Sequence, residues 1–267
     1  MKFVVLNDDR CDNENLKCEH GLSFYIEYDN LKILFDAGQT DNYIQNAKQL
    51  GVNLSDVDYI VLSHGDYDHG NGLKYFDKKI SLICHPDCFI PRLSIRTGNN
   101  AGLNQTRLEM ANKFKLIESR NQYKINNSIF YLGEIDRNIC VDNKHISVRN
   151  IDGSENQQLD DSGLAIKTNK GLVVISGCAH SGICNIIEYA KKVTNEEKVY
   201  AVFGGFHLKH VDETCQKTFD YFKKNNIEKI FPCHCNSDEI CDEFKKIFNK
   251  QTTILKTGME INIWIKN

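Results

Sequence analysis

The sequence of 267 residues is poor in Pro, Met and Trp, with three, three and one copies, and it contains no long uninterrupted apolar run. A helix that spans a membrane needs about 20 consecutive, mostly apolar residues, so the sequence predicts no membrane-embedded segment. Internal repeats, low-complexity tracts and Pro- or Gly-rich linkers are missing as well. We therefore expect one domain over residues 1–267, with 41% hydrophobic residues available for its core.

An excess of positive charge is also missing. The 33 Lys and Arg residues against 36 Asp and Glu residues give a formal net charge of −3. This balance lacks the basic surface that nucleic-acid binding requires, so we expect no nucleic-acid partner and disfavour an RNA-processing nuclease. The start of the chain turns acidic at Asp8 and Asp9, which does not match a secretory signal.

Cysteine, by contrast, is abundant. Eleven Cys residues are scattered along the chain, and their number is odd. Without a secretory signal, this usage is typical of reduced thiols and not of a disulfide framework. The sequence therefore predicts a cytoplasmic protein.

Potential metal ligands are concentrated in one short segment. His64, Asp66, Asp68 and His69 form the pattern H-x-D-x-D-H directly after the apolar run 57–62, which is typical of a buried strand. Imidazole and carboxylate groups are the usual ligands of catalytic divalent metals where no thiolate intervenes. In extended backbone, the residues at 64, 66 and 68 share one face and His69 takes the other, so the segment would offer ligands to two neighbouring ions. The alternative is a solvated polar loop with chance histidines.

Three further His residues share a common context, an apolar strand followed by a tight turn. They are His180 after residues 172–175, His207 after residues 199–203 and His234 after residues 229–231. Functional side chains converge where strands of α/β layouts end. Any one His is equally consistent with a buried structural role, but three in the same context favour a shared site.

The remaining pattern is rich in strands. Two apolar runs, 22–28 and 31–35, flank Asp29-Asn30, which predicts a two-residue hairpin turn. Thr40 is the expected N-cap of a helix that runs through Leu50 and is stopped by Gly51. We expect further strands at 2–6, 80–84, 114–117, 123–125, 128–132, 145–151, 164–167, 252–255 and 260–265, and further helices at 181–193, 212–224 and 237–248. Residues 89–113 are expected to form an irregular insertion or lid, with a small surface helix as the alternative.

Taken together, these motifs resemble the metallo-β-lactamase superfamily, whose signature is H-x-H-x-D-H. Asp66 stands where that signature has its second His, and because carboxylates suit harder ions, iron and manganese are open beside zinc. Several segments occur in the same order in the branch of dihydropterin–ribofuranosylaminobenzene-phosphate synthases: Glu19-His20-Gly21-Leu22-Ser23, Phe35-Asp36-Ala37-Gly38, Gly204-Gly205-Phe206-His207-Leu208 and Pro232-Cys233-His234-Cys235. The resemblance implies an α+β fold, a four-layer αββα sandwich with metals at one edge.

The resemblance also implies a site with two divalent metal ions. The first ion would be held by His64, Asp66 and His180, and the second by Asp68, His69 and His234. Cys178 stands where the superfamily commonly has an Asp that bridges both metals; we expect a buried thiol there, with a bridging ligand as the alternative. A bound dication lowers the pKa of water from about 15.7 to about 7. The expected function is therefore a hydrolase or synthase in which metal-bound hydroxide attacks a small phosphorylated or pterin-like substrate.

The remaining roles concern catalysis and substrate binding. Asp68 is expected to orient the attacking water, and His207 is the second catalytic candidate. Substrate contacts are expected from His20, His85 and Arg92, with a solvated surface charge as the alternative for the arginine. The sequence 180–182 opens a predicted helix, and helix N-termini bind anions such as phosphate.

Two other functions are compatible with the same residues. A di-iron protein that reduces oxygen or nitric oxide would use the same fold, although no flavin-type domain accompanies it here. A non-catalytic, metal-dependent binder would hold a small molecule without turnover. An iron–sulfur protein is disfavoured because Cys233, Cys235 and Cys241 match no common spacing. The substrate, the native metal and the oligomeric state are left open by the sequence.

Overall fold

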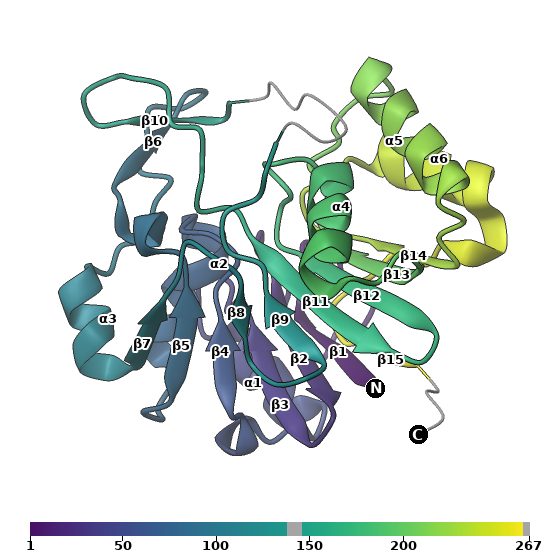
Figure 1. The fold of residues 1–267 in the computed structure, drawn as a ribbon. Coiled ribbons are helices and arrows are strands. Elements are labelled where there is room, and N and C mark those ends of the chain that lie inside the picture. The colour runs from purple at the N-terminus through teal and green to yellow at the C-terminus, as the bar shows by residue number, and fades with distance from the viewer. Residues whose placement is uncertain (138–145, 264–267) are drawn as a thin grey trace. The chain divides into compact units, whose positions relative to one another are not determined.

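The computed structural model describes residues 1–137 and 146–263. They group into two compact units, each built around one β-sheet (Figure 1). The first unit comprises residues 1–120, 146–160 and 256–263, and the second comprises 121–137 and 161–255. The single domain expected over 1–267 stays a prediction. Within the described ranges, no helix combines the length and apolar character that crossing a membrane requires.

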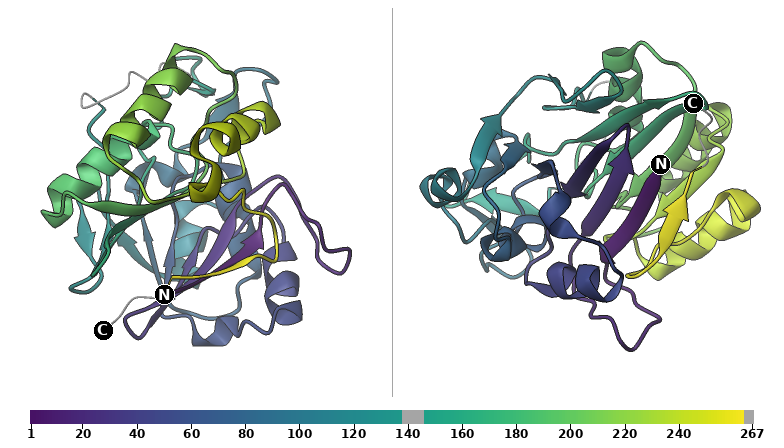
Figure 2. Two further views of the ribbon diagram at one scale, coloured as in Figure 1. Left: turned by 90° about the vertical axis from the view of Figure 1, so that its right-hand side faces the viewer. Right: turned by 90° about the horizontal axis from the view of Figure 1, so that it is seen from below.

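The first unit contains a seven-stranded sheet of order β15-β1-β2-β3-β4-β5-β7. Its strands are β1 Lys2–Asn7, β2 Ser23–Tyr28, β3 Leu31–Phe35, β4 Tyr59–Val61, β5 Ser81–Cys84, β7 Lys115–Glu118 and β15 Glu260–Asn262. Figure 2 shows β15 beside β1, with which it pairs antiparallel. Strands β3, β4, β5 and β7 run parallel, so the loops that follow them leave the same edge of the sheet.

Helix α1 (Asn42–Gln49) packs on this sheet through Tyr43 and Ala47, which join the apolar cluster of Val4 and Leu34. The N-cap expected at Thr40 is wrong. Asp41 occupies the N-cap position without a side-chain cap. The Thr40 hydroxyl, one residue earlier, donates to Glu19 Oε2 at 2.7 Å and accepts from the Asn42 N–H at 3.2 Å. Short 3-10 helices flank the strands, η1 Leu54–Asp56, η2 Asn71–Tyr75 and η3 Pro86–Phe89.

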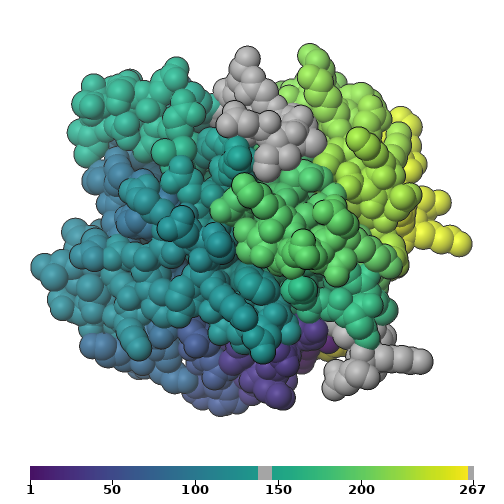
Figure 3. Space-filling view, in the orientation of Figure 1, coloured from purple at the N-terminus to yellow at the C-terminus, as the bar shows by residue number. Residues whose placement is uncertain are grey.

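Residues 89–113 are more regular than the sequence suggested. They contain β6 (Arg92–Ser94), which pairs with β10 (Val148–Asn150), and helix α3 (Arg107–Lys113). A capping box between Thr106 and Glu109 begins α3 and satisfies its free N–H groups. The hairpin around β10 forms a projecting part of the surface (Figure 3). A lid role for this segment stays a prediction.

The second unit contains a six-stranded sheet of order β14-β13-β12-β11-β9-β8. Its strands are β8 Tyr123–Lys124, β9 Ile129–Tyr131, β11 Gly163–Thr168, β12 Gly171–Ser176, β13 Val199–Gly204 and β14 Lys229–Pro232. Helices α4 (Ile183–Thr194), α5 (Glu213–Lys224) and α6 (Asp238–Phe248) cover one face of this sheet (Figure 1), and their apolar stripes form one core cluster with it. The predicted helix starts at Asp212 and Ser237 are confirmed as N-caps.

One predicted strand is wrong. Residues 252–255 follow the short helix η4 (Asn249–Gln251) and contribute a single bridge, between Thr252 and Ile230, instead of a strand. The ends of two other predicted strands, His145 and residues 264–265, lie outside the described residues. The fold class is confirmed: the chain is α+β, with both sheets flanked by helices within their own units.

The hairpin turn predicted at Asp29-Asn30 is confirmed, since both residues have positive φ, 53° and 58°. A type I′ turn needs this conformation, which Asn tolerates and Ala does not. We expect Asn30→Ala to lower the free energy of unfolding by about 1 kcal/mol, because Ala is strained in the left-handed region. Asn30→Gly, which relieves that strain, should match or exceed wild type in urea unfolding. Equal midpoints for the Ala and Gly variants would contradict this account of the turn.

Candidate metal centre

The loop after β4 carries the four predicted ligands of the first unit. Asp66 is the N-cap residue of the short helix α2 (Tyr67–Gly70), so Asp68 and His69 are helical. The extended backbone expected through 64–69 is therefore wrong. Successive residues of a helix are rotated by about 100° about its axis. The side chains of Asp68 and His69 therefore do not point to opposite faces, as they would in a strand.

One carboxylate from a neighbouring strand end organises both histidines. Asp36 follows β3, and its Oδ2 accepts hydrogen bonds from Ser63 Oγ and His69 Nδ1, each at 2.7 Å. Ser63 Oγ, having donated to Asp36, accepts from His64 Nδ1 at 2.8 Å. Both rings thus hold their proton on Nδ1, and both Nε2 atoms are left as lone-pair donors.

The two imidazoles are close and surrounded by protein. His64 and His69 are fully buried, and their ring centroids lie 4.1 Å apart. Burial and the neighbouring His64 lower the pKa of His69, although Asp68 and Asp36 oppose this. The neutral form, which is the form that binds metal, is therefore favoured at His69.

The carboxylates of the segment lie beside these nitrogens. Asp66 Oδ2 is 3.4 Å from His64 Nε2, and Asp68 Oδ2 is 3.7 Å from His69 Nε2. His20 connects Asp68 to Asp9: its Nε2 is 3.2 Å from Asp68 Oδ2 and its Nδ1 is 2.8 Å from Asp9 Oδ2. The predicted substrate residue His20 is thus adjacent to the predicted catalytic carboxylate.

Arg92, predicted to contact substrate, is buried, with 1% of its surface exposed. Its guanidinium pairs with both oxygens of Asp160, at 3.0 and 2.9 Å, and lies 3.4 Å from Asp66 Oδ1. Burial would lower the pKa of Arg92, but the charges of Asp160 and Asp66 raise it overall. Gln158 donates to Asp66 Oδ2 at 3.0 Å. The arginine therefore holds the Asp66 carboxylate, and it is not a solvated surface charge.

His85 follows β5 at the same sheet edge and is fully buried. Its Nδ1 accepts the Asp87 backbone N–H at 3.1 Å, and its Nε2 lies 3.4 Å from Arg120. The side chain thus caps the short helix η3. A contact between His85 and a substrate stays a prediction.

In the second unit, three loops leave the parallel strands β12, β13 and β14 side by side. The last residues of these strands are in register, Ser176 with Gly204 and Gly204 with Pro232. The loops are bonded to one another, because the Gly205 N–H donates to Gly177 O and the Cys233 N–H donates to Gly204 O. The three predicted His residues of this unit follow these strand ends, as the sequence pattern indicated.

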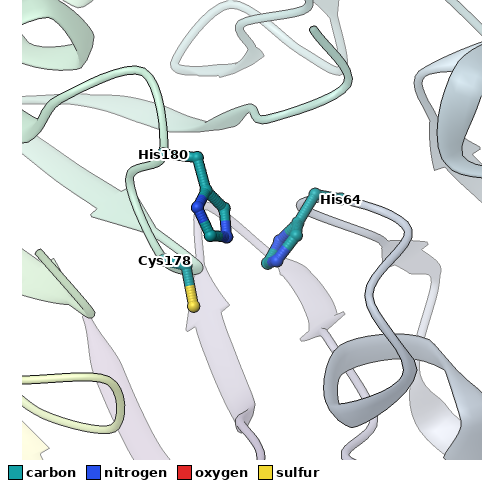
Figure 4. Close-up of side chains that lie close together, drawn as sticks. All are labelled: His64, Cys178 and His180. Carbon is teal, nitrogen blue, oxygen red and sulfur yellow. The ribbon is translucent and has the colours of Figure 1, made fainter. Parts of the chain in front are cut away.

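The first of these loops joins β12 to α4 and carries Cys178 and His180. Figure 4 draws their side chains, together with His64 of the first unit. Both are nearly buried, with exposures of 5% and 6%. The Cys178 Sγ lies within 4.8 Å of a ring nitrogen of His180 and within 4.8 Å of a ring nitrogen of His234. Within this unit, a thiol therefore lies near both predicted imidazole ligands.

His207 and His234 occupy the other two loops, both in the left-handed backbone region, with φ of 52° and 50°. The His207 ring packs against His180, with centroids 4.5 Å apart. Asn236 fixes the two loops together, because its Oδ1 accepts from the Phe206 and Leu208 N–H groups at 3.3 Å. The side chain of Asn236 also donates to Cys233 O at 3.0 Å.

A second thiol, Cys235, is buried beside this group, with its Sγ 3.7 Å from Cys178 O. Burial would raise the pKa of Cys235, but a hydrogen bond from Cys178 and the charges of His234, Lys209 and His180 lower it overall. The low pKa reflects the accumulation of positive charge and hydrogen-bond donors around these loops.

The helix start that was expected to bind phosphate is partly occupied. Asp161 Oδ2 accepts from both the N–H and the hydroxyl of Ser181, at 2.8 and 2.5 Å. A protein carboxylate therefore already binds the turn that precedes α4. The N–H groups of the first turn of α4 itself are not part of this contact.

The donor atoms fit a divalent metal. Two nitrogen or oxygen ligands of a tetrahedral ion, each about 2.0–2.1 Å from it, lie roughly 3.3–3.4 Å apart. The separation of 3.4 Å between His64 Nε2 and Asp66 Oδ2 matches that value. Fixed tautomers and carboxylate partners behind the rings are typical of metal-binding histidines. The second unit supplies imidazoles and a thiol, which also bind divalent ions.

Two residues with clear roles here were not predicted as site residues. Asp36 was noted only as part of a shared motif, and Asp160 not at all. The signal for Asp36 was present, since it directly follows an apolar strand, as the predicted ligands do. Asp160 lies 95 positions from Gly65, to whose N–H it accepts a hydrogen bond, and no local pattern marks it.

Comparisons with known proteins relate the whole chain to one superfamily. The sequence model of the metallo-beta-lactamase superfamily matches residues 16–82. The chain is 34% identical to the 7,8-dihydropterin-6-methyl-4-(beta-D-ribofuranosyl)-aminobenzene-5'-phosphate synthase of Methanocaldococcus jannaschii, over 94% of each protein. It is 33% identical to the uncharacterized protein MJ0448 of the same organism, over 86% of this chain and 89% of that protein. The crystal structure of Tm1679, a metal-dependent hydrolase of the beta-lactamase superfamily, covers 98% of this chain and 99% of its own, with 28% identity and a TM-score of 0.83.

Proposed function

Because the chain belongs to the metallo-β-lactamase superfamily, in the branch that includes the dihydropterin synthase of M. jannaschii, we propose that it is a metal-dependent enzyme acting on a small pterin-like or phosphorylated substrate. The observation that carries the proposal is the hydrogen-bond relay from Asp36. This one buried carboxylate sets the tautomer of both His64 and His69, so that two Nε2 atoms are prepared as ligands. A structural histidine pair would not need this common orientation.

We assign six ligands to two divalent ions. The first set is His64, Asp66 and His180, and the second is Asp68, His69 and His234. Their support is the burial of the four imidazoles and the placement of each carboxylate beside a ring nitrogen in its own unit. When bound, such ions supply Lewis acidity and a water of lowered pKa.

The chain's own residues would orient and accept protons. The Asp68 carboxylate lies within hydrogen-bond distance of His20, and it is suited to orient an attacking water and to take its proton. His20 can pass that proton on, because its other nitrogen is held by Asp9. His207, which packs against His180, is the candidate general acid that the second unit contributes.

The nature of the substrate rests on the relatives. The M. jannaschii protein is named as a synthase of a dihydropterin that carries a 5'-phosphate. A flat heterocycle with a phosphate is therefore the first substrate class to test. Whether the bond change is hydrolysis or group transfer is decided by product analysis.

Metal content is the direct test of the proposed function. Protein purified without oxygen should carry close to two divalent transition ions per chain, and Asp68→Ala and His234→Ala should each lose metal, because each removes one ligand. His210→Ala is the matched control, since His210 is exposed and is not assigned as a ligand. Wild-type protein without metal, or metal content that neither ligand variant changes, would refute the assignment.

The element that is found separates the alternative functions. Zinc or manganese with turnover of a phosphorylated pterin supports the enzyme proposed here. Two iron ions with a reversible redox spectrum would favour the oxygen or nitric oxide reductase instead. Binding of a pterin without product would favour a non-catalytic binder.

A further inference from the structure

We infer that Cys178 is a metal ligand, a thiolate shared between the two ions that His180 and His234 bind. The inference rests on the proposed function, because it requires a metal-loaded protein. It goes beyond the six nitrogen and oxygen ligands assigned above. It also specifies the kind of metal that the site prefers.

The position of the sulfur is the main argument. Cys178 Sγ lies within 4.8 Å of a ring nitrogen of His180 and, separately, of His234. These two imidazoles are assigned to different ions, so a donor atom near both is placed to contact both. In the described part of the chain, Cys178 is the only cysteine in any cluster of potential ligand atoms of this kind.

The backbone holds the sulfur in this place. Ala179, the next residue, has a φ of 56°, and its carbonyl accepts from the Gly182 N–H at 2.8 Å. Gly177, the preceding residue, accepts from the Gly205 N–H at 2.9 Å. A Cβ on Gly205 would lie 2.5 Å from Gly177 O, so the two loops pack too closely for a side chain there. The tight turn that presents Cys178 is thereby fixed on both sides.

A thiolate at this position changes the chemistry of the site. A dication that binds a thiol displaces its proton, so Cys178 would contribute a full negative charge. Sulfur is a softer donor than carboxylate oxygen and favours zinc and iron over manganese and magnesium. Zinc–sulfur bonds are about 2.3 Å long, against 2.0–2.2 Å for oxygen.

Cobalt substitution tests the inference directly. Co²⁺ bound by a thiolate shows an intense sulfur-to-cobalt charge-transfer absorption in the near ultraviolet, which nitrogen and oxygen ligands do not give. Apoprotein titrated with Co²⁺ should develop this band. Cys178→Ser should lose the band and bind Co²⁺ at least tenfold more weakly, in line with the roughly 10–100-fold cost of losing even an outer partner of a metal site.

Two variants serve as controls. Cys235→Ser removes the neighbouring buried thiol, whose sulfur lies 3.7 Å from Cys178 O, and it should retain the band. Cys178→Asp replaces the thiolate with a carboxylate. It should bind Co²⁺ more tightly than Cys178→Ser does, without showing the charge-transfer band. This second variant keeps the test valid if Cys178→Ser does not fold.

The outcomes separate the inference from the proposed function. Loss of the band in Cys178→Ser but not in Cys235→Ser supports the inference. A band that survives in Cys178→Ser, or wild-type protein that binds two Co²⁺ without any band, overturns it and leaves the metal-dependent enzyme intact. Wild-type protein that binds no Co²⁺ and no other divalent ion overturns both.

Discussion

Asp36→Asn should weaken metal binding by about 10–100-fold, the usual cost of losing an outer partner of a metal ligand. The mutation replaces an acceptor oxygen by an NH₂ group that faces His69 Nδ1 and Ser63 Oγ. A donor at that place favours the tautomer with the proton on Nε2 of His69, and a protonated nitrogen cannot bind metal. Asn is chosen because it tolerates the positive φ of 56° at this position.

The same substitution should also destabilise the apoprotein. Asp36 and Ser63 are fully buried, and the carboxylate accepts from the Ser63 N–H and hydroxyl at 2.7 Å each. Leaving one of these donors unsatisfied costs about 1–3 kcal/mol. Competition with a chromophoric chelator measures the metal affinity, and urea unfolding of the apoprotein measures the stability.

Asp58→Asn is the matched control. Asp58 also accepts a backbone N–H, that of Lys32 at 2.8 Å, but at an exposed site away from the histidines. It should leave metal affinity unchanged. If Asp36→Asn bound metal as tightly as Asp58→Asn, the relay would have no part in preparing the ligands, and the main support for the proposed metal centre would be lost.

Strand ends could be located from the sequence because they follow a simple physical rule. A buried strand is a short apolar run, and the first polar residues after it lie at the sheet edge. The rule correctly placed His64, His180, His207 and His234 on loops after β4, β12, β13 and β14. Parallel pairing then brings the loops of each unit to one edge, which the sequence pattern indicates without any contact information.

The local conformation of the metal-binding loop was predicted wrongly. Alternation of side chains assumes extended backbone, but Asp66 ends the extended stretch and begins a helical turn at Tyr67. Asp is a favoured N-cap residue, so this signal was available in the sequence. The prediction instead followed the spacing of His64, Asp66 and Asp68, which is two residues each and is also the spacing of side chains on one face of a strand.

The partners of the ligands were beyond sequence reasoning for another reason. Asp160 reaches Arg92 across 68 positions, and Gln158 reaches Asp66 across 92. No periodicity or motif links residues so far apart, and their polar character in the sequence suggests loops exposed to solvent. Only the folded first unit shows that these side chains are buried together.

Replacing Arg92 by Met should therefore lower the free energy of unfolding, and its effect should not be limited to substrate affinity. The guanidinium is the cation between the buried carboxylate of Asp160 and that of Asp66, whose side chain is 13% exposed. Its removal leaves an uncompensated buried charge, which typically costs about 3–5 kcal/mol. Urea unfolding of the apoprotein should show the loss. Arg92→Met combined with Asp160→Leu should recover part of it, because the double variant removes the unpaired charge.

Arg107→Met provides the control for this prediction. Arg107 makes a comparable pair with Glu118, but its side chain is 62% exposed, and exposed pairs contribute only about 0–1 kcal/mol. If Arg92→Met were no more destabilised than Arg107→Met, and instead raised KM for the identified substrate, the arginine would be a substrate contact as the sequence suggested. A large loss of stability, with recovery in the double variant, would assign Arg92 to the support of Asp66. In that case Asp66 depends on the positive charge of Arg92, because Asp66 places a negative charge where the superfamily signature has a His.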